Sequence, residues 1–312
     1  MSPGSETDAP QPTDGPPSDS TELDAPPDSF FGPPPTACVE KWLSATPPTF
    51  STPGFIPQSG NQPITSTIDE RDPFVSSDKL LIYFSRVDGS NLDILNAIRA
   101  DAAGTFGGAV VKSSLTDESQ EDSKVTMTGD DLIAFIASRR AAGEGESDLW
   151  EARRDTAGTT AFGTMTQEHL AEVNDTTSQL DPHISPDGLR LYFAAGDPQK
   201  IMLSSRTSLD ASFGAPAVVG QINGTTGDAD PSMTADERVI LFTRRDANGD
   251  TDLFFATRAE RDQPFGTPQA VTFNSVDQDA DPMITGDGCT VFFASTRDPG
   301  TSDYDLYVTN QQ

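Results

Sequence analysis

The sequence is poor in basic residues and has no long apolar run. Its 20 Lys and Arg residues stand against 49 Asp and Glu residues in a chain of 312, and the formal net charge is −29. Because phosphate contacts would be repulsive, this charge disfavours binding to nucleic acid or to an anionic lipid surface and favours a cationic partner or ion. No apolar run reaches about eighteen residues, so no transmembrane segment is expected.

Signatures of nucleophilic and metal-dependent catalysis are also missing. His169 and His183 are the only histidines, and no group of His and Cys residues has metal-ligand spacing. No Gly-x-Ser-x-Gly elbow, phosphate-binding glycine loop or Cys–His pair occurs. We therefore expect a protein without a cofactor, apart from the calcium alternative below, and without a catalytic residue that the sequence reveals.

Only two cysteines are present, Cys38 and Cys289. A disulfide between them would close a loop of about 250 residues, which the chain-entropy description values at roughly 4 to 5 kcal/mol. The alternative is a pair of buried free thiols. A Cα separation beyond about 7 Å would exclude the disulfide.

The first 36 residues differ in composition from the rest. They are rich in Pro, Ser, Asp, Gly and Thr and have almost no apolar residue before Phe30, so we expect a disordered tail over residues 1–36 and one folded domain over residues 37–312. No export signal begins at Met1. The tail nevertheless resembles the tether of a bacterial lipoprotein, so we expect an extracytoplasmic protein, in the periplasm or at the cell surface and lipid-tethered, in which Met1 is a trimmed or misassigned start.

A hairpin over residues 181–193 is the clearest local structure. Pro186 sets φ for a turn, Asp187 can bond to its own backbone, and Gly188 tolerates a positive φ. Apolar and polar residues then alternate as in a strand. The hairpin occurs five times in the chain. The five copies begin at Asp72, Lys124, Asp181, Asp230 and Asp281.

Each hairpin is followed by signals for two more strands. Four of the third-strand segments are followed by an arginine: Arg99, Arg154, Arg206 and Arg258. A Phe-Gly pair comes next in each, and we expect it to open the fourth strand; its phenylalanines are Phe106, Phe162, Phe213 and Phe265. Four short strands in about fifty residues are typical of a β-propeller blade. The expected blades cover residues 68–111, 114–165, 180–219, 229–271 and 280–308.

The last blade lacks a fourth strand, because the chain ends at Gln312. Residues 50–56 match the fourth-strand pattern of residues 265–271, so we expect the N-terminal strand to complete the last blade. Closure of the ring would remove exposed sheet edges. The sequence thus predicts an all-β, five-bladed propeller, with six blades as the alternative. Short helices are expected over residues 37–43, anchored by Trp42, and over residues 167–173.

The repeat, Asp-Pro followed by Pro-Asp-Gly, Leu-x-Phe and later Asp-Leu-Tyr, resembles the repeat of TolB-type, WD-repeat-like bacterial β-propellers. Residues 181–193 match best, and residues 281–293 with 305–307 come next. The resemblance implies the architecture and an exported binding scaffold. TolB itself is similar to a six-bladed ring behind an α/β domain, whereas this chain shows five repeats behind a tail, so TolB's own role does not follow.

The first positions of the hairpins are the main candidate site. Asp72, Lys124, Asp181, Asp230 and Asp281 should surround one mouth of the central channel, and acidic residues two positions earlier should add to the charge. Such a ring could hold a cation or a basic peptide, with Lys124 relieving repulsion. The alternative is that each aspartate bonds backbone amides. His183 could also face the channel.

A calcium loop is a second candidate. Asp246, Asn248, Asp250 and Asp252 place oxygen ligands at alternate positions around an Asn-Gly turn, as in the first half of a calcium-binding loop. The distal bidentate glutamate is missing. An ordinary hairpin connection explains the same residues.

These features favour a monomeric, non-catalytic binding scaffold whose partner is a protein or a glycan. The alternative is a glycan-active or glycan-binding propeller, since five-bladed propellers also occur among glycosidases. That alternative requires two carboxylates about 5 to 9.5 Å apart at unequal positions. The visible carboxylates lie at equivalent positions, which favours the scaffold.

Overall fold

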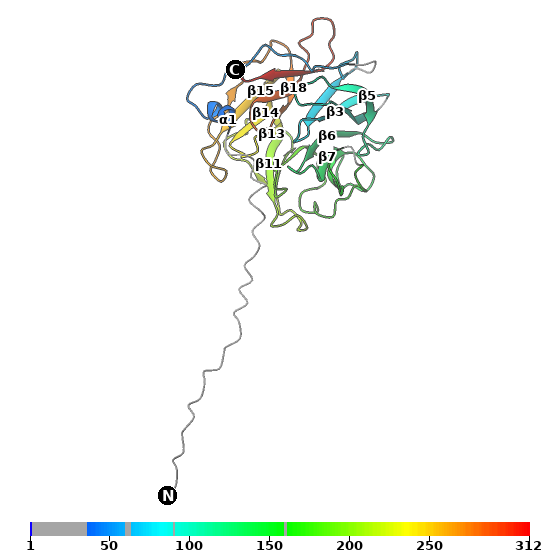
Figure 1. The fold of residues 1–312 in the computed structure, drawn as a ribbon, viewed down its shortest axis with the longest axis vertical. Coiled ribbons are helices and arrows are strands. Elements are labelled where there is room, and N and C mark those ends of the chain that lie inside the picture. The colour runs from blue at the N-terminus through cyan, green and yellow to red at the C-terminus, as the bar shows by residue number, and fades with distance from the viewer. Residues whose placement is uncertain (2–35, 60–63, 90, 159–160) are drawn as a thin grey trace.

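The computed structural model describes Met1 and residues 36–59, 64–89, 91–158 and 161–312. Five small antiparallel sheets stand around a common centre, with very little helix (Figure 1). The five-bladed propeller is therefore confirmed and the six-bladed alternative is wrong. The tail expected over residues 1–36 lies outside the described residues, apart from its first and last members.

The first strand of each blade is innermost, because β2, β6, β9, β13 and β17 contact one another in a closed ring. The first two blades are β2 (Glu70–Val75), β3 (Leu81–Asp88), β4 (Asn91–Ile98) and β5 (Gly107–Lys112), then β6 (Asp122–Met127), β7 (Ile133–Ser138) and β8 (Asp148–Arg153). The third is β9 (Gln179–Ile184), β10 (Arg190–Ala195), β11 (Lys200–Ser205) and β12 (Ala217–Val218). The last two are β13 (Asp228–Met233), β14 (Val239–Arg245), β15 (Thr251–Thr257) and β16 (Gln269–Ala270), then β17 (Asp279–Ile284), β18 (Thr290–Ser295), β19 (Asp305–Asn310) and β1 (Gly54–Phe55).

The N-terminal strand closes the ring as expected. β1 pairs antiparallel with β19, with Gly54 opposite Val308 and Phe55 opposite Tyr307. A further bridge joins Phe50 to Gln311. The last blade therefore contains strands from both ends of the chain. β1 pairs with the outer edge of β19, which has no later strand of its own to cover it.

A disulfide strengthens this closure. Cys38 and Cys289 are bonded, with their Cα atoms 5.1 Å apart, so the disulfide prediction is confirmed. The bond joins helix α1 (Ala37–Trp42) to the turn before β18. Trp42 anchors the helix, because its indole Nε1 donates to the carbonyl of Gly288 at 2.9 Å. The chain is thus tied across the fifth blade by a covalent bond as well as by strand pairing.

The hairpin turns owe their repetition to one aspartate each. Asp187 Oδ1 accepts hydrogen bonds from the Ser185 hydroxyl and from the Leu189 amide at 3.0 Å. The next residue, Gly188, has φ +72°, and a Cβ there would lie 2.6 Å from the Leu209 side chain. The same pair of hydrogen bonds occurs at Asp78, Asp130, Asp236 and Asp287. Local chemistry therefore sets the hairpin in every blade.

The recurring arginine and phenylalanine form one structural unit. The Arg206 guanidinium lies 4.5 Å from the Phe213 ring centre, and its Nε donates to the Gly188 carbonyl at 2.7 Å. Equivalent contacts, with 4.3 to 4.4 Å between cation and ring, join Arg99 to Phe106, Arg154 to Phe162 and Arg258 to Phe265. Each arginine thus clamps the outer chain of its blade to its own hairpin turn.

Removal of one clamp should destabilise the fold. Arg206→Met deletes the hydrogen bond to Gly188 and leaves the fully buried Glu151 with one partner fewer, so we expect a loss of about 2 to 4 kcal/mol in the free energy of unfolding. The exposed Arg139→Met is the matched control, with an effect within about 0.5 kcal/mol. Urea denaturation measures both. Equal midpoints for the two variants would contradict the clamp.

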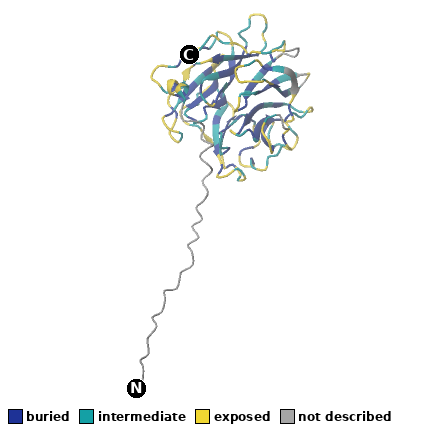
Figure 2. Ribbon diagram, viewed as in Figure 1, coloured by how far each residue is buried: buried dark blue, intermediate teal, exposed yellow. Residues whose placement is uncertain are grey.

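Buried residues gather in the strands of the propeller (Figure 2), and the hydrophobic clusters join residues of neighbouring blades. Phe135 of the second blade and Phe193 of the third share one buried cluster, for example, and Tyr192 of the third shares another with Phe242 of the fourth. This arrangement follows from the alternation of the strands, which presents apolar side chains to the sheets on either side.

Three local expectations were wrong. The Phe-Gly pairs of the third and fourth blades precede their outer strands, because β12 and β16 begin several residues later. In the second blade, the described residues form no fourth strand, and an isolated bridge between Glu151 and Thr166 lies at the outer edge of β8. Residues 167–173 form turns instead of a helix, since Leu170 and Val173 donate to carbonyls three residues earlier. In the described part of the chain, no helix has the length and apolarity needed to cross a membrane.

Candidate functional site

The five predicted ring residues share an unusual backbone conformation. Asp72, Lys124, Asp181, Asp230 and Asp281 all have φ between 48° and 55°, and each lies at an irregularity in the pairing of its innermost strand. Aspartate enters this left-handed region more readily than most residues. The structural alternative from the sequence is therefore part of the explanation, because each aspartate suits a bulge. Lysine has no such advantage.

Lys124 is instead explained by charge. Its Nζ lies 4.0 Å from Asp72 Oδ1 and 3.9 Å from Asp230 Oδ1. Carboxylate oxygens of Asp72, Asp181 and Asp230 all lie within 4.8 Å of one another. The structure thus brings the ring residues together at the centre of the propeller. One buried ammonium group faces four carboxyl groups.

Burial and mutual repulsion disfavour ionisation of two acids of this ring. Burial, with the nearby carboxylates of Asp230 and Asp72, raises the pKa of Asp181 and of Asp281 well above the ordinary range. Burial disfavours the Lys124 ammonium, but Asp230 and Asp72 outweigh burial and raise the Lys124 pKa. The ring therefore favours the charged form of its lysine and disfavours the charged forms of Asp181 and Asp281.

Asp281→Asn should weaken the dependence of stability on pH. Because the folded-state pKa of Asp281 exceeds its unfolded value, its stabilising contribution is complete below about pH 4 and is lost as the pH rises through the folded-state pKa. Asparagine tolerates the left-handed backbone but does not ionise. Thermal unfolding should show the variant above the wild type by roughly 2 to 4 °C at about pH 8 and equal to it near pH 4. Lower stability of the variant at both pH values would contradict this account.

The second acidic layer does not add to the ring charge, contrary to expectation. Glu70, Asp122, Asp228 and Asp279 are buried, and each is ion-paired with an arginine of the second strand or the segment just after it, at 2.5 to 3.2 Å. Each also accepts a hydrogen bond from a loop amide, as Asp279 does from Ser275 N at 2.6 Å. These carboxylates close loops and are already neutralised.

A polar cavity of about 350 Å³ lies at the starts of the innermost strands. The ring aspartates contribute to it, and Arg71 and Tyr304 form part of its wall, with the guanidinium 3.7 Å from the ring centre. The Tyr304 hydroxyl donates to Gln278 Oε1 at 2.6 Å. Carboxylates, amides and guanidinium groups of this kind could bind the hydroxyl groups of a sugar or an amine.

The ring carboxylates do not meet one condition set for a glycosidase acid–base pair. They occupy equivalent positions, whereas the two carboxylates of such an enzyme have different roles. Oxygens of Asp72, Asp181 and Asp230 lie within 4.8 Å of one another.

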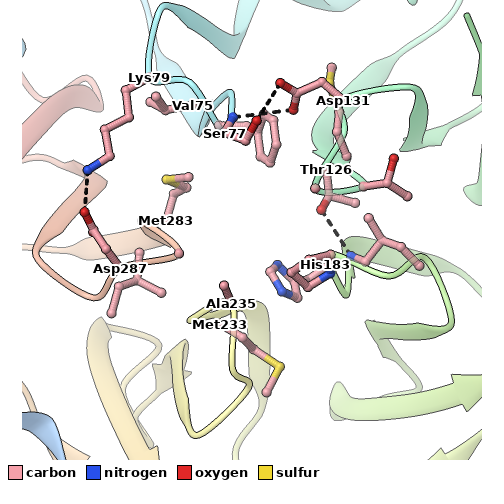
Figure 3. A pocket seen from close by; sticks show the side chains of 18 of the residues that line it. Val75, Ser77, Lys79, Thr126, Asp131, His183, Met233, Ala235, Met283 and Asp287 are labelled. Carbon is pink, nitrogen blue, oxygen red and sulfur yellow. Dashed lines mark hydrogen bonds and ion pairs between the residues drawn. The ribbon is translucent and has the colours of Figure 1, made fainter. Parts of the chain in front are cut away.

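A larger cavity of about 550 Å³ opens among the hairpin turns, at the opposite ends of the innermost strands (Figure 3). Its lining is largely apolar and includes Val75, Met127, Ile184, Met233 and Met283. Size and lining both match typical small-ligand sites, which measure about 300 to 1,000 Å³. Sequence reasoning missed this cavity. A usable signal was the hydrophobic residue that ends every innermost strand.

His183 lines this apolar cavity rather than the polar one. Its Nε2 is buried without a hydrogen-bond partner among the described residues. Burial, with the nearby Lys124 ammonium, lowers the pKa of His183 to about 3. The imidazole is therefore neutral at physiological pH, and it can offer a hydrogen bond to a ligand in the cavity.

One charged pair at the cavity rim is already engaged. Lys79 Nζ forms an ion pair with Asp287 Oδ2 at 2.6 Å, and the Ser77 hydroxyl donates to Asp131 Oδ2 at 3.0 Å. Burial tends to raise the pKa of Asp287, but Lys79 and Thr285 outweigh it and lower that pKa. Lys79 is therefore held by an acid, whereas Asp236 Oδ2, also in the lining, is buried without a hydrogen-bond partner among the described residues.

The calcium loop forms an ordinary hairpin connection between β14 and β15. Asp246 Oδ1 accepts from the amides of Asn248 at 2.7 Å and Asp250 at 3.0 Å. Among the described residues, the acidic groups close enough to share an ion are those of the ring, and the loop containing Asp252 is not among them. Calcium binding by this loop stays a prediction that the geometry does not strengthen.

Solved structures resemble this fold at low sequence identity. No protein family model matches the chain, and no curated protein matches its sequence. An endo-arabinase from Bacteroides thetaiotaomicron is similar, with 15% identity, TM-score 0.55 and coverage of 82% of this chain and 98% of that one. An α-L-arabinofuranosidase from Podospora anserina has 10% identity, TM-score 0.53 and coverage of 85% and 97%. TolB from Acinetobacter baumannii has 13% identity and coverage of 88% and 67%, but its TM-score of 0.46 supports no further argument. These similarities establish the propeller fold alone.

Proposed function

We propose that this protein is a non-catalytic, extracytoplasmic propeller that binds a ligand or a segment of a partner in the apolar cavity. The observation that carries the proposal is a cavity of about 550 Å³ whose lining is largely apolar and whose rim lysine, Lys79, is ion-paired with Asp287. Such a site can hold an apolar group and orient it through His183.

The disulfide supports the proposed location. Stable disulfides form in oxidising compartments such as the periplasm or the cell exterior, and Cys38 and Cys289 are joined. In this proposal residues 1–36 link the propeller to its site of attachment.

Glycan binding is the second candidate, favoured by the polar cavity. Arg71, Gln278 and Tyr304 adjoin the ring aspartates there, and a cavity of about 350 Å³ is large enough for a sugar ring. The fold neighbours include an enzyme named for arabinan cleavage. The same geometry argues against turnover, because the ring acids surround Lys124.

Two assays separate these functions. The apolar cavity is tested by titration with the fluorescent probe N-phenyl-1-naphthylamine. We expect saturable binding that is abolished in Ala235→Trp, which fills the cavity, and retained in Ala171→Trp, an exposed control. Debranched arabinan is tested for retardation on native affinity gels and for release of reducing ends. Release of reducing ends that disappears in Asp181→Asn would overturn the proposal in favour of a glycosidase.

A further inference from the structure

The N-terminal segment leaves the folded domain at the rim of the apolar cavity. Thr36, the first residue described after the tail, lines that cavity. Its hydroxyl donates to the carbonyl of Asp287 and accepts from the Val39 amide at 3.4 Å. Cys38, two residues later, is covalently fixed to Cys289. Chain N-terminal to Thr36 therefore starts beside the cavity and cannot move away from it.

The nearest part of that segment carries two of its three large apolar residues. Between Met1 and Thr36, the large apolar side chains are those of Leu23, Phe30 and Phe31. Phe31 is five positions before Thr36, and the chain spans at most about 3.3 to 3.6 Å per position, or roughly 17 Å. Both phenylalanines can therefore reach the cavity without any rearrangement of the anchor.

Cavity size and chemistry fit this pair of rings. A dry cavity on the order of 150 Å³ is enough to hold a benzene molecule, and this one measures about 550 Å³. Met233 and Met283 line it, and thioethers adapt to and contact aromatic rings favourably. Figure 3 shows the Met283 and His183 side chains on opposite sides of an open centre.

We propose that Phe30 and Phe31 occupy the apolar cavity, so that the protein carries its own competitor for the site. The inference rests on the proposed function, since it assumes that the cavity binds apolar groups. A short tether gives its occupant an effective concentration in the millimolar range. An external ligand then binds only to the fraction of molecules whose cavity is vacant, and its apparent affinity falls by that fraction.

The test compares full-length variants for binding of N-phenyl-1-naphthylamine. A Phe30→Ser/Phe31→Ser variant should bind the probe about tenfold more tightly than the wild type, as expected for a segment whose own dissociation constant is about 0.1 mM at a millimolar effective concentration. Leu23→Ser is the matched control and should behave like the wild type. A peptide corresponding to residues 28–35 should displace the probe from the double variant. Equal affinity in the double variant and the wild type overturns the inference.

The cavity-filling variant distinguishes this failure from failure of the proposed function. If Ala235→Trp abolishes probe binding while the double variant binds the probe no more tightly than the wild type, the cavity binds ligands but the tail does not occupy it. If the probe binds none of the proteins, both proposals fail.

Photocrosslinking identifies the occupant directly. With p-benzoyl-phenylalanine in place of Phe31, irradiation should link residue 31 to Met233 or Met283 within one chain. Crosslinks only between two chains would overturn the intramolecular assignment in favour of a second copy as occupant. Crosslinks elsewhere on the propeller would reject the cavity.

Discussion

We expect Lys124→Met to lose about 3 to 5 kcal/mol of unfolding free energy at about pH 8. Lys124 is 4% exposed, and its Nζ lies about 4 Å from Asp72 and Asp230. Methionine keeps the length of the side chain but removes the ammonium. Four buried carboxyl groups would then have no lysine cation among them, and those still ionised would repel one another at low local dielectric.

The pH dependence of this loss separates charge from packing. The pKa values of Asp181 and Asp281 are already raised by burial and neighbouring acids, and loss of the ammonium should raise them further. Stability should therefore fall more steeply with rising pH in the variant than in the wild type, and the deficit should shrink near pH 4. Urea denaturation at several pH values, with the exposed Lys41→Met as control, measures this. A deficit that does not change with pH would identify Lys124 as a packing residue only.

The second large effect is expected from the disulfide. Cys38→Ser/Cys289→Ser opens a covalent loop with a sequence separation of 251, and the chain-entropy description predicts a loss of about 4 to 5 kcal/mol. The loss should appear as a lower midpoint of chemical denaturation. Because α1 packs through Trp42 against Phe255, with ring centres 5.0 Å apart, we expect the helix to remain bound in the double variant.

Reduction of the wild type provides the control for this substitution. Dithiothreitol should lower the wild-type midpoint to that of the double variant and should leave the variant unchanged. A wild-type midpoint that is insensitive to complete reduction would show that β1 and α1 hold the ring closed without the covalent bond. Equal destabilisation of both proteins by the reductant would point to an effect unrelated to Cys38 and Cys289.

Both predicted losses of stability concern closure of the propeller, at its centre for Lys124 and at the last blade for the disulfide. The buried ring around Lys124 holds the five innermost strands together, and the bond to Cys289 holds the two ends of the chain together. Neither feature needs a ligand. Neither Lys124 nor the disulfide lines the apolar cavity, so the cavity is available for binding.

The amino-acid sequence by itself determined the number of blades and the manner of closure. Each hairpin turn is made by an aspartate that bonds residues two positions away, as Asp187 does with Ser185 and Leu189, so its signal is local and recurs. The same count of repeats shows that the last blade lacks a fourth strand at the C-terminus. It also predicts that the strand near Phe55 supplies it. The positions of Cys38 and Cys289 in that closed ring suggested a disulfide and left free thiols as the alternative, and the structure shows the disulfide.

Only the tertiary structure decided which charges remain unpaired and where a ligand fits. Asp279 and Asp281 look alike in the sequence, but Arg297 neutralises the first at 2.5 Å while the second faces the central ring. That difference depends on which side of the strand each residue faces after the left-handed residue interrupts the alternation. The apolar cavity is likewise invisible locally, because Met233, Met283 and His183 come from three different blades that meet only when the ring closes.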